Sequence, residues 1–338
     1  MILRTDGSVK RILCILLVLS TIWGCSSYQK ETAKETLAFS VLPISSSLLG
    51  LPIQIVAFDS VLLVNDYYGD TLVHCLSLRT GGEITKFGVR GSGPNEVMPP
   101  LHLLKTPDSL FVLSRPQWIL YTVSGTPRVH LEKKMRLPVA VSLLFSLGDS
   151  SYLASGMFPD KRFYIFDSAG KEKSRFGDYP NFWSRENDLP IEVKRMFHQV
   201  RGYGFSIKNG FALADSHVLS LYRHTSSGYV LSKEVLLAPY EYDFNVNGIE
   251  SITKLKPSFA TGVIDLAVSD EFIYVLFDSN IKDTSSKSKN EVWRYDWDGN
   301  LLNKYVPNVD ISLITVHPDG TLIGLTGEEE SKIAFVKF

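Results

Sequence analysis

The sequence predicts an all-β protein in which one unit of about four short strands recurs six times. Short runs of β-branched, aromatic and leucine residues recur along the chain, each bounded by polar turn residues that include glycine. The turn glycines Gly82, Gly125, Gly170, Gly228 and Gly299 follow one another at spacings of 43, 45, 58 and 71 residues. Roughly 300 residues follow the N-terminal segment, enough for six units of about 45 residues each. This arithmetic is typical of a six-bladed β-propeller with four-stranded antiparallel blades.

The repeated unit is clearest in two copies, Phe163 to Lys171 and Val292 to Asn300. Each is a β-run followed by a polar turn in which a glycine tolerates a positive φ, while an earlier Asp or Ser can bond the turn backbone. Two packed β-sandwiches are the alternative arrangement, but the period is too long and too regular to favour them. Looser copies span residues 73–83, 119–126 and 219–228.

The last copy of the unit, Ile311 to Phe338, contains three strands rather than four. The segment Leu37 to Leu42 has the apolar pattern of a strand and can supply the fourth. We therefore expect the N-terminal and C-terminal strands to close the ring together, which would remove exposed sheet edges.

One segment near residues 190–200 has the pattern of a short inserted helix. Pro190 suits a first helical turn, and Val193, Met196, Phe197 and Val200 follow at helical spacing. Such a helix either packs over the propeller or presents its apolar face to a partner.

The N-terminus has the pattern of a targeting segment. Arg4, Lys10 and Arg11 form a basic region, and residues 12–19 form an apolar run that is too short to span a bilayer. The run ends before Gly24-Cys25, which resembles the lipobox of bacterial lipoproteins, whose cysteine is lipidated; a buried strand with an incidental cysteine is the alternative. The predicted divisions are a signal peptide over 1–24, a flexible tether from lipidated Cys25 over 25–36, and the propeller over 37–338.

Cysteine content and charge exclude several classes of protein. Of the three cysteines, Cys14 leaves with the signal peptide and Cys25 carries the lipid, so Cys75 has no partner for an intrachain disulfide. The remaining chain holds 32 basic and 35 acidic residues, a net charge of about −3. It therefore lacks the positive field that nucleic acids or anionic lipids require, and we expect no nucleic-acid partner and membrane contact through the N-terminal lipid only.

A glycine-rich stretch, Phe87 to Glu96, lies between two predicted hairpins. Its three glycines and one proline exclude a helix or a central strand, so it is predicted to be a connector. Pro94 stands where a phosphate-binding loop needs lysine, and Glu96 stands where a dinucleotide fingerprint needs its third glycine. We expect Glu96 to accept hydrogen bonds from the backbone of its own turn rather than to bind a ligand.

This stretch, with Leu120 to Gly125 after it, is similar to NHL-repeat propellers. The whole segment 37–338 resembles the TolB-like six-bladed β-propeller lipoproteins of Bacteroidetes, with further matching stretches at 210–214, 272–276 and 295–299. The resemblance implies an outer-membrane lipoprotein that faces either the periplasm or the cell surface. Surface-exported members often carry acidic residues after the lipidated cysteine, and Ser26 to Lys30 lacks them, so a periplasm-facing anchor is favoured.

Catalytic and metal-binding motifs are largely missing from the sequence. His74 and Cys75 are adjacent in a strand and point to opposite faces, so they cannot share a metal ion. No Gly-x-Ser-x-Gly elbow occurs. We expect no metal and no cofactor, although Asp66 and Asp265 are candidate acids for the central channel. A lactonase-like, metal-dependent hydrolase with a site in that channel is the alternative function.

The expected function is binding, with an envelope protein or peptide as the first candidate ligand and a glycan or small molecule as the second. A purely structural scaffold is a third class, and we expect a monomer. Propellers bind ligands on loops held by a rigid ring, and aromatic residues and arginine are the usual anchors of interfaces. Each such residue can equally be a packed blade residue or a solvated side chain. The candidate surface comprises Tyr67, Tyr68, Arg90, Arg115, Trp118, Trp183, Arg201 and Tyr203.

Overall fold

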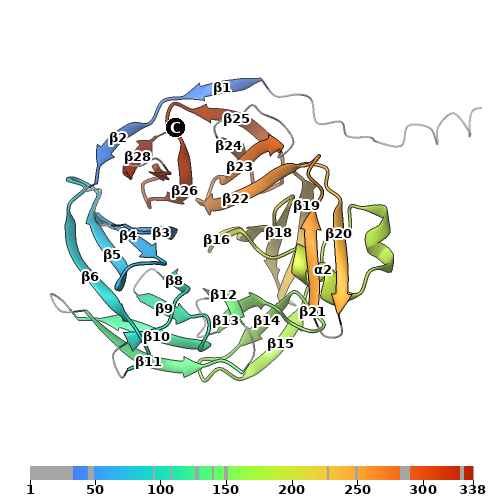
Figure 1. Ribbon diagram of the computed structural model, residues 1–338, viewed down its shortest axis with the longest axis horizontal. Helices are drawn as coiled ribbons and strands as arrows, with labels where there is room; N and C mark the ends of the chain where they lie inside the picture. Colours follow the sequence, from blue (N-terminus) through green and yellow to red (C-terminus); the bar gives the residue numbers. More distant parts are fainter. Residues whose placement is uncertain are drawn as a thin grey trace, which may run out of the picture. The chain divides into compact units, whose positions relative to one another are not determined.

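Six sheets are arranged around a common centre in the computed structural model, so the prediction of an all-β, six-bladed propeller is confirmed (Figure 1). The predicted signal peptide and Cys25 lie outside the described residues. No helix within the described residues is long and apolar enough to cross a membrane. The described residues are 33–44, 49–93, 96–106, 109–125, 129–138, 141–147, 151–226, 228–247, 250–281, 290–327 and 331–337.

The position of a strand in its blade follows from its composition. Strand β13 (Tyr152–Gly156) is apolar along its length and almost wholly buried, because neighbouring blades cover both of its faces. Strand β15 (Glu172–Phe176) is charged and mostly exposed, because it forms the outer edge of the same blade. Charged residues on an outer strand also discourage pairing with other chains.

In the described residues, the first three blades each run from an innermost to an outermost strand in chain order. A two-residue strand, β7 (Glu96–Val97), extends the first blade by parallel pairing with β6. The strands are β3 (Pro52–Phe58), β4 (Val61–Asp66), β5 (Thr71–Ser77) and β6 (Glu83–Arg90); β8 (Leu101–Lys105), β9 (Leu110–Ser114), β10 (Ile119–Ser124) and β11 (His130–Arg136); and β12 (Val141–Ser146), β13, β14 (Phe163–Phe166) and β15.

The remaining blades keep this order, and the N-terminal strands β1 (Lys34–Leu37) and β2 (Ser40–Pro43) join the fifth and sixth of them. The strands are β16 (Gly202–Ser206), β17 (Gly210–Ala214), β18 (Val218–Thr225) and β19 (Gly228–Leu236); β22 (Ala260–Val268), β23 (Ile273–Ile281), β24 (Glu291–Tyr295) and β25 (Leu301–Pro307); and β26 (Ile311–Val316), β27 (Leu322–Thr326) and β28 (Lys332–Val336).

The sixth blade takes its outer strand from the N-terminal side of the chain. Strand β2 pairs antiparallel with β28, with Ser40 opposite Phe335. This strand begins three residues later than the segment predicted for it, because Leu37 ends β1, which pairs in parallel with β25. Strand β1 begins at Lys34, within the segment that the sequence analysis assigned to the tether.

Each pair of neighbouring blades shares a hydrophobic core. Blades four and five, for example, bury Leu221 and Val235 against Val275 and Trp293. Equivalent clusters lie between the other neighbouring blades, around the whole ring. The stability of the ring therefore depends on contacts between successive repeats.

Four of the five turn glycines have the positive φ that the sequence pattern predicts. Gly125, Gly170, Gly228 and Gly299 have φ values of 88°, 80°, 112° and 80° in the hairpins that precede the outer strands. In the first blade, the residue with positive φ is Gly81, at 70°, rather than the predicted Gly82. The backbone of Gly81 turns against Pro43, leaving no room for a side chain there.

The glycine-rich stretch 87–96 is part strand and part connector. Its first four residues end β6, which is an outer strand and thus tolerates glycine. The backbone N–H of Gly93 donates a hydrogen bond to Glu96 Oε2 at 2.8 Å. The structural role predicted for Glu96 is therefore confirmed.

An insertion between β15 and β16 contains a short 3₁₀ helix, η1 (Ser184–Asp188), and the predicted helix, α2 (Ile191–Phe197). Helix α2 contacts a hairpin formed by β20 (Tyr242–Asn247) and β21 (Glu250–Leu255), beside the fourth blade in Figure 1. The ring of Phe197 stacks on Tyr242 with 3.8 Å between centroids. The apolar side of α2 is thus largely covered by this hairpin.

Candidate functional site

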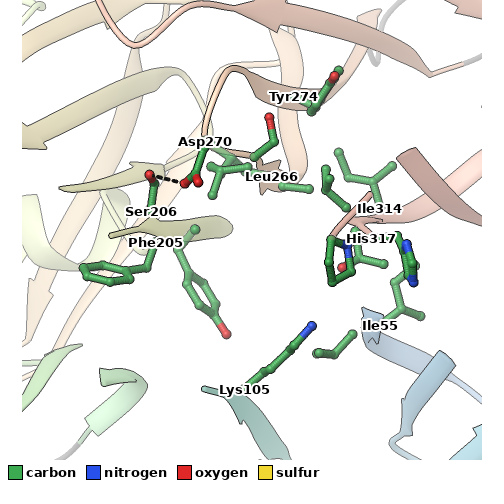
Figure 2. A pocket seen from close by; sticks show the side chains of 18 of the residues that line it. Ile55, Lys105, Phe205, Ser206, Leu266, Asp270, Tyr274, Ile314 and His317 are labelled. Carbon is green, nitrogen blue, oxygen red and sulfur yellow. Dashed lines mark hydrogen bonds between the residues drawn. The ribbon is translucent and has the colours of Figure 1, made fainter. Parts of the chain in front are cut away.

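A cavity of about 830 Å³ lies at the centre of the propeller. Residues of the innermost strand of every blade line it: β3, β8, β12, β16, β22 and β26. Figure 2 shows side chains from several of these strands converging on the same space. A cavity of this size is in the range that ligand-binding pockets occupy.

The cavity reaches the surface at one end of the propeller. Because every blade repeats the same order of strands, the turns that follow the six innermost strands lie at the same end. Residues of these turns line the cavity, among them Ile207, Asp270 and His317. Ile207 is 82% exposed, an unusual position for an isoleucine. The turns after the innermost strands therefore form the rim.

The fourth blade approaches the fifth closely at the cavity, and glycine makes this possible. A Cβ on Gly202 would lie 2.3 Å from the backbone nitrogen of Leu266, and one on Gly204 would lie 2.5 Å from a methyl group of Val268. Tyr203, between these glycines, lines the cavity. The glycines on either side of Tyr203 thus let β16 lie against β22, while the ring of Tyr203 points to the opposite face and contacts Phe145.

Tyr203 joins a hydrogen-bonded group with Gln54 and His102. Gln54 Nε2 donates to the Tyr203 hydroxyl at 3.0 Å. The Tyr203 hydroxyl lies 3.0 Å from His102 Nε2 and 3.2 Å from its Nδ1. His102 Nε2 also lies 3.1 Å from Leu144 O, and because a carbonyl oxygen can only accept, the ring proton is on Nε2. Burial lowers the pKa of His102 to about 4, so this ring is neutral at physiological pH.

Asp265 lines the cavity from β22. Its Oδ1 accepts the backbone N–H of Leu266 at 2.8 Å, and its Oδ2 accepts that of Ile314, on the next blade, at 2.9 Å. Burial raises the pKa of Asp265 to about 7, although these two hydrogen bonds favour the ionised form. Within the described residues Asp265 forms no ion pair, so no positive charge compensates its ionised carboxylate.

The rim carries polar and charged side chains that already have hydrogen-bond partners. Lys105 Nζ donates to Ala57 O at 2.7 Å and lies over the ring of Phe58. Asp270 accepts the hydroxyl of Ser206 at 2.6 Å, as the dashed line in Figure 2 marks. His317 Nε2 donates to Asp59 O at 2.7 Å. These bonds fix the turns of neighbouring blades against one another.

The walls between the rim and Asp265 are mainly apolar. Ile55, Phe145, Leu266 and Ile314 come from four different blades and line this part of the cavity. Phe145 packs edge-to-face against Tyr203 with 4.6 Å between centroids. The cavity therefore combines an apolar middle with a few fixed polar groups, an arrangement that orients a ligand.

A second polar cluster is buried beneath the insertion and does not line the cavity. His198 lies between Glu186 Oε1 and Asp215 Oδ2, with 2.8 Å to each. Tyr240 and Tyr242 donate their hydroxyls to Glu186 at 2.8 and 3.0 Å. These five side chains form hydrogen bonds with one another. The cluster therefore attaches the insertion to the fourth blade and is not a binding site.

The opposing charges set the pKa values of this buried cluster. Burial raises the pKa of Asp215 and Glu186, but their contacts with His198 hold both below their ordinary values. Burial lowers the pKa of His198, but Asp215 and Glu186 outweigh it and raise the pKa above its ordinary value. The cluster is thus an ion pair network with a protonated histidine at its centre.

Most of the predicted surface lies at the opposite end from the rim. Tyr67 and Tyr68 occupy the turn between the second and third strands of the first blade, and their rings meet edge-to-face at 5.1 Å. Arg90 donates to the backbone oxygens of Tyr67 and Gly69, which brings it to the same turn. Tyr68 is 68% exposed. Tyr67, Tyr68 and Arg90 thus form one group.

The other predicted residues are dispersed. Arg115 and Trp118 occupy the corresponding turn of the second blade, where Trp118 packs against the core. Trp183 packs edge-to-face against Tyr242, within the insertion. Arg201 precedes β16 and donates from Nε to Ser216 Oγ at 3.4 Å. Of the predicted surface residues, Tyr203 is the one that lines the cavity.

The two candidate channel acids have different positions. Asp265 lines the cavity, whereas Asp66 accepts the backbone N–H groups of Gly50, Leu51 and Tyr68 and holds a turn together. Among the described residues, no three side chains of His, Cys, Asp or Glu are grouped to hold a metal ion.

Several residues of the cavity were not singled out by the sequence analysis. Gln54, Lys105 and His317 are ordinary members of strands and turns in the sequence, and their common position depends on contacts between distant repeats. The one local signal was the pair of glycines around Tyr203, because glycine inside a strand marks close backbone approach.

Comparisons with known proteins agree with this fold. The model of the TolB-like 6-blade propeller-like family matches residues 29–319, and the chain belongs to that family. No curated protein matches the sequence.

Three solved structures illustrate the likeness. A Bacteroides fragilis protein, provisionally named an exported protein, is similar with a TM-score of 0.59 and 14% identity, over 90% of this chain and 98% of that one. U3-55K is similar with a TM-score of 0.54 and 10% identity, over 90% of this chain and 100% of that one. The RRP9 WD40 repeats are similar with a TM-score of 0.54 and 10% identity, over 91% of this chain and 100% of that one. At these identities the likeness extends to the fold alone.

Proposed function

We propose that this protein is an envelope lipoprotein whose propeller binds a short peptide segment of a partner protein, or a small ligand, in the central cavity. The observation that carries this proposal is the cavity of about 830 Å³, which all six innermost strands line and which opens among the turns that follow them. A rigid ring with an open, mostly apolar pocket and a few fixed polar groups is suited to recognition.

The lining favours a peptide or small amphipathic molecule over a glycan. Aliphatic residues such as Ile55, Leu266 and Ile314 line the middle of this cavity beside the aromatic rings of Phe145 and Tyr203, and this apolar surface suits the side chains of a peptide. No tryptophan occurs among the described residues that line it. A glycan is therefore the second candidate class.

The proposal can be tested by panning a phage-displayed library of short random peptides against the purified propeller. Val316→Trp places a large ring in the cavity, and Val230→Trp makes the same change on the outer strand β19, where Val230 is exposed. Selected peptides should bind the wild type and Val230→Trp equally, and Val316→Trp at least about tenfold more weakly. Equal binding to Val316→Trp, after circular dichroism shows that it is folded, would place the ligand elsewhere.

The membrane attachment is a separate part of the proposal. The sequence Gly24-Cys25 after an apolar run supports lipidation of Cys25, with the signal peptide over 1–24 removed and a tether from Cys25 leading to strand β1 of a periplasm-facing propeller. Cells fed an alkyne fatty acid should label the wild type and Cys75→Ser, since Cys75 is buried, but not Cys25→Ser. Label that persists in Cys25→Ser would contradict the anchor.

The orientation and oligomeric state follow from the same proposal. A periplasm-facing monomer should resist proteinase K in intact cells and become sensitive once the outer membrane is permeabilised. Light scattering of the Cys25-truncated protein should give the monomer mass. Digestion in intact cells would instead indicate the cell surface.

A further inference from the structure

The charged groups of the cavity are unevenly distributed. Asp265, Asp270 and Glu271 come from β22 or the turn that follows it, so this wall is acidic from the interior to the rim, whereas on the sixth blade Asp319 is paired with Lys337 at 3.9 Å. Lys105, on β8, has its ammonium group on Ala57 O and over the ring of Phe58. The ammonium group of Lys105 is therefore already hydrogen-bonded to strand β3.

Asp265 stands out among these acids because it is partly buried, whereas Asp270 and Glu271 are exposed, and because it has no positive partner in the described residues. Each of its oxygens accepts one backbone N–H, and a carboxylate can accept about four hydrogen bonds in all. Each oxygen thus has capacity for a further donor from the cavity side. An uncompensated carboxylate in such a place is costly to ionise, and this cost falls when a cation binds.

The path from the rim to Asp265 is long and apolar. Asp265 lies three residues before the end of β22 at Val268, which corresponds to about 10 Å of extended strand, and Asp270 lies in the turn beyond that end. Ile55, Phe145, Leu266 and Ile314 line the space along this path. Such a lining suits methylene groups, which long basic side chains and polyamines carry behind a charged head.

From this geometry we propose that the cavity takes an elongated ligand with a protonated amine or guanidinium at its leading end, that Asp265 receives this group, and that the aliphatic stem lies against the apolar walls. This inference rests on the proposed function of the cavity. The cationic group can belong to the basic terminus of a peptide or to a free polyamine, and both share the same chemistry at Asp265.

The test uses two acetylated tetrapeptides that differ only at their C-terminal residue, lysine amide or norleucine amide, so that the second lacks the amine. Isothermal titration calorimetry at pH 8 should show the lysine peptide binding the wild type about tenfold more tightly than the norleucine peptide. Asp265→Asn should remove most of this preference, and Asp178→Asn, at an exposed acid that does not line the cavity, should retain it. Cadaverine serves as the probe for a free polyamine.

The pH dependence provides an independent measurement. Lowering the pH from 8 to 6 should weaken the lysine peptide and leave the norleucine peptide unchanged, because Asp265 becomes protonated over this range. In wild-type protein labelled with ¹³C at Asp carboxyls, the lysine peptide should lower the pKa of Asp265. The NMR measurement remains valid if Asp265→Asn, which removes the acceptor of the Ile314 N–H, fails to fold.

The possible outcomes separate the two proposals. Equal affinities of the two peptides for the wild type, or an unchanged preference in Asp265→Asn, would overturn the cation inference. If library peptides still depended on an open cavity at Val316, the proposed binding function would stand without it. Cadaverine binding that depends on Asp265 would identify a free polyamine as the source, and binding by the lysine peptide alone would identify a peptide.

Discussion

Asp215 is fully buried and Asp265 is partly buried in the wall of the cavity, and their surroundings are opposite. Asp215 contacts His198 at 2.8 Å and Arg162 at 3.5 Å, and these positive groups hold its pKa below the ordinary value against the effect of burial. Asp265 meets two backbone N–H groups and no cation among the described residues, and burial raises its pKa to about 7. Burial alone thus does not decide the charge of a carboxyl; its partners do.

The comparison distinguishes a structural acid from a candidate binding group. The buried cluster around Asp215 has internally matched charges and fastens the insertion to the ring. The cavity around Asp265 has an unmatched acid with access to the surface. Unmatched, perturbed groups in cavities are more often functional than matched ones.

The largest expected effect is at the centre of the matched cluster. His198→Ala leaves Glu186 and Asp215 buried without their shared partner, and it should lower the free energy of unfolding by about 3–5 kcal/mol. Urea denaturation followed by circular dichroism measures this. His224→Ala, at an exposed histidine, should change it by less than about 0.5 kcal/mol. Similar losses in both variants would show that the cluster does not hold the fold together.

The loss of unfolding free energy in His198→Ala should also depend on pH. The pKa of His198 is raised in the folded state, so the stability it contributes is present below its ordinary value of 6.5 and is lost as pH rises through the raised value. The difference between His198→Ala and wild type should therefore shrink in alkaline buffer. A difference that stays constant between pH 6 and pH 10 would contradict a protonated His198.

A smaller change in stability is expected at Asp265, where the partly buried acid lacks a positive partner in the described residues. Because its folded pKa of about 7 exceeds the ordinary 3.8, the folded state binds more protons between these values, and the stability it contributes falls as pH rises. Asp265→Asn should therefore gain stability relative to wild type between pH 4 and pH 8. The gain is at most about 4 kcal/mol, and solvent access through the cavity reduces it.

Thermal unfolding at a series of pH values would measure this gain. Val316→Ala changes the same cavity without a titrating group, so its difference from wild type should not vary with pH. If the curves for Asp265→Asn and wild type ran parallel, the carboxyl would be ionised throughout, and the contrast with Asp215 would disappear.

The smallest effect is expected where a buried acid is matched by an exposed base. Glu291 is buried and bonds Lys34, Ser279 and Trp293, while the side chain of Lys34 is mostly exposed. Lys34→Ala should cost about 0.5–1 kcal/mol, because two neutral donors remain on Glu291. Lys161→Ala, from an ion pair with both partners exposed, should cost less in the same denaturation assay. A cost of several kcal/mol for Lys34→Ala would show that strand β1 depends on this pair.

The fold was predictable because its signals are local. A turn glycine, an apolar run and a polar outer strand recur in each blade, and each can be recognised within about ten residues. Even the insertion followed its local pattern, with Val193 and Phe197 on the covered side of α2. The prediction named Gly82 as the turn glycine, but Gly81 has the positive φ, because either glycine of an adjacent pair can adopt it.

The site was less predictable because it is assembled from six distant strands. Sequence named Asp66 and Asp265 as equivalent channel acids, but one holds a turn and the other lines the cavity. The predicted aromatic and arginine residues lie mostly in turns at the other end of the ring. Which end opens into a cavity depends on how blades meet, as the approach of β16 to β22 at Gly202 illustrates, and no local pattern encodes it.

The pairing of β2 with β28 has a consequence for the order in which the protein matures. Ser40 lies opposite Phe335, so strand β2 can pair only after β28, which is synthesised almost 300 residues later. Until then the first and sixth blades cannot share their core, and long-range pairing of this kind slows folding. The segment of β2 therefore lacks this partner until β28 has been synthesised. Chaperones that shield such edges should matter more for this protein than for one whose blades close locally.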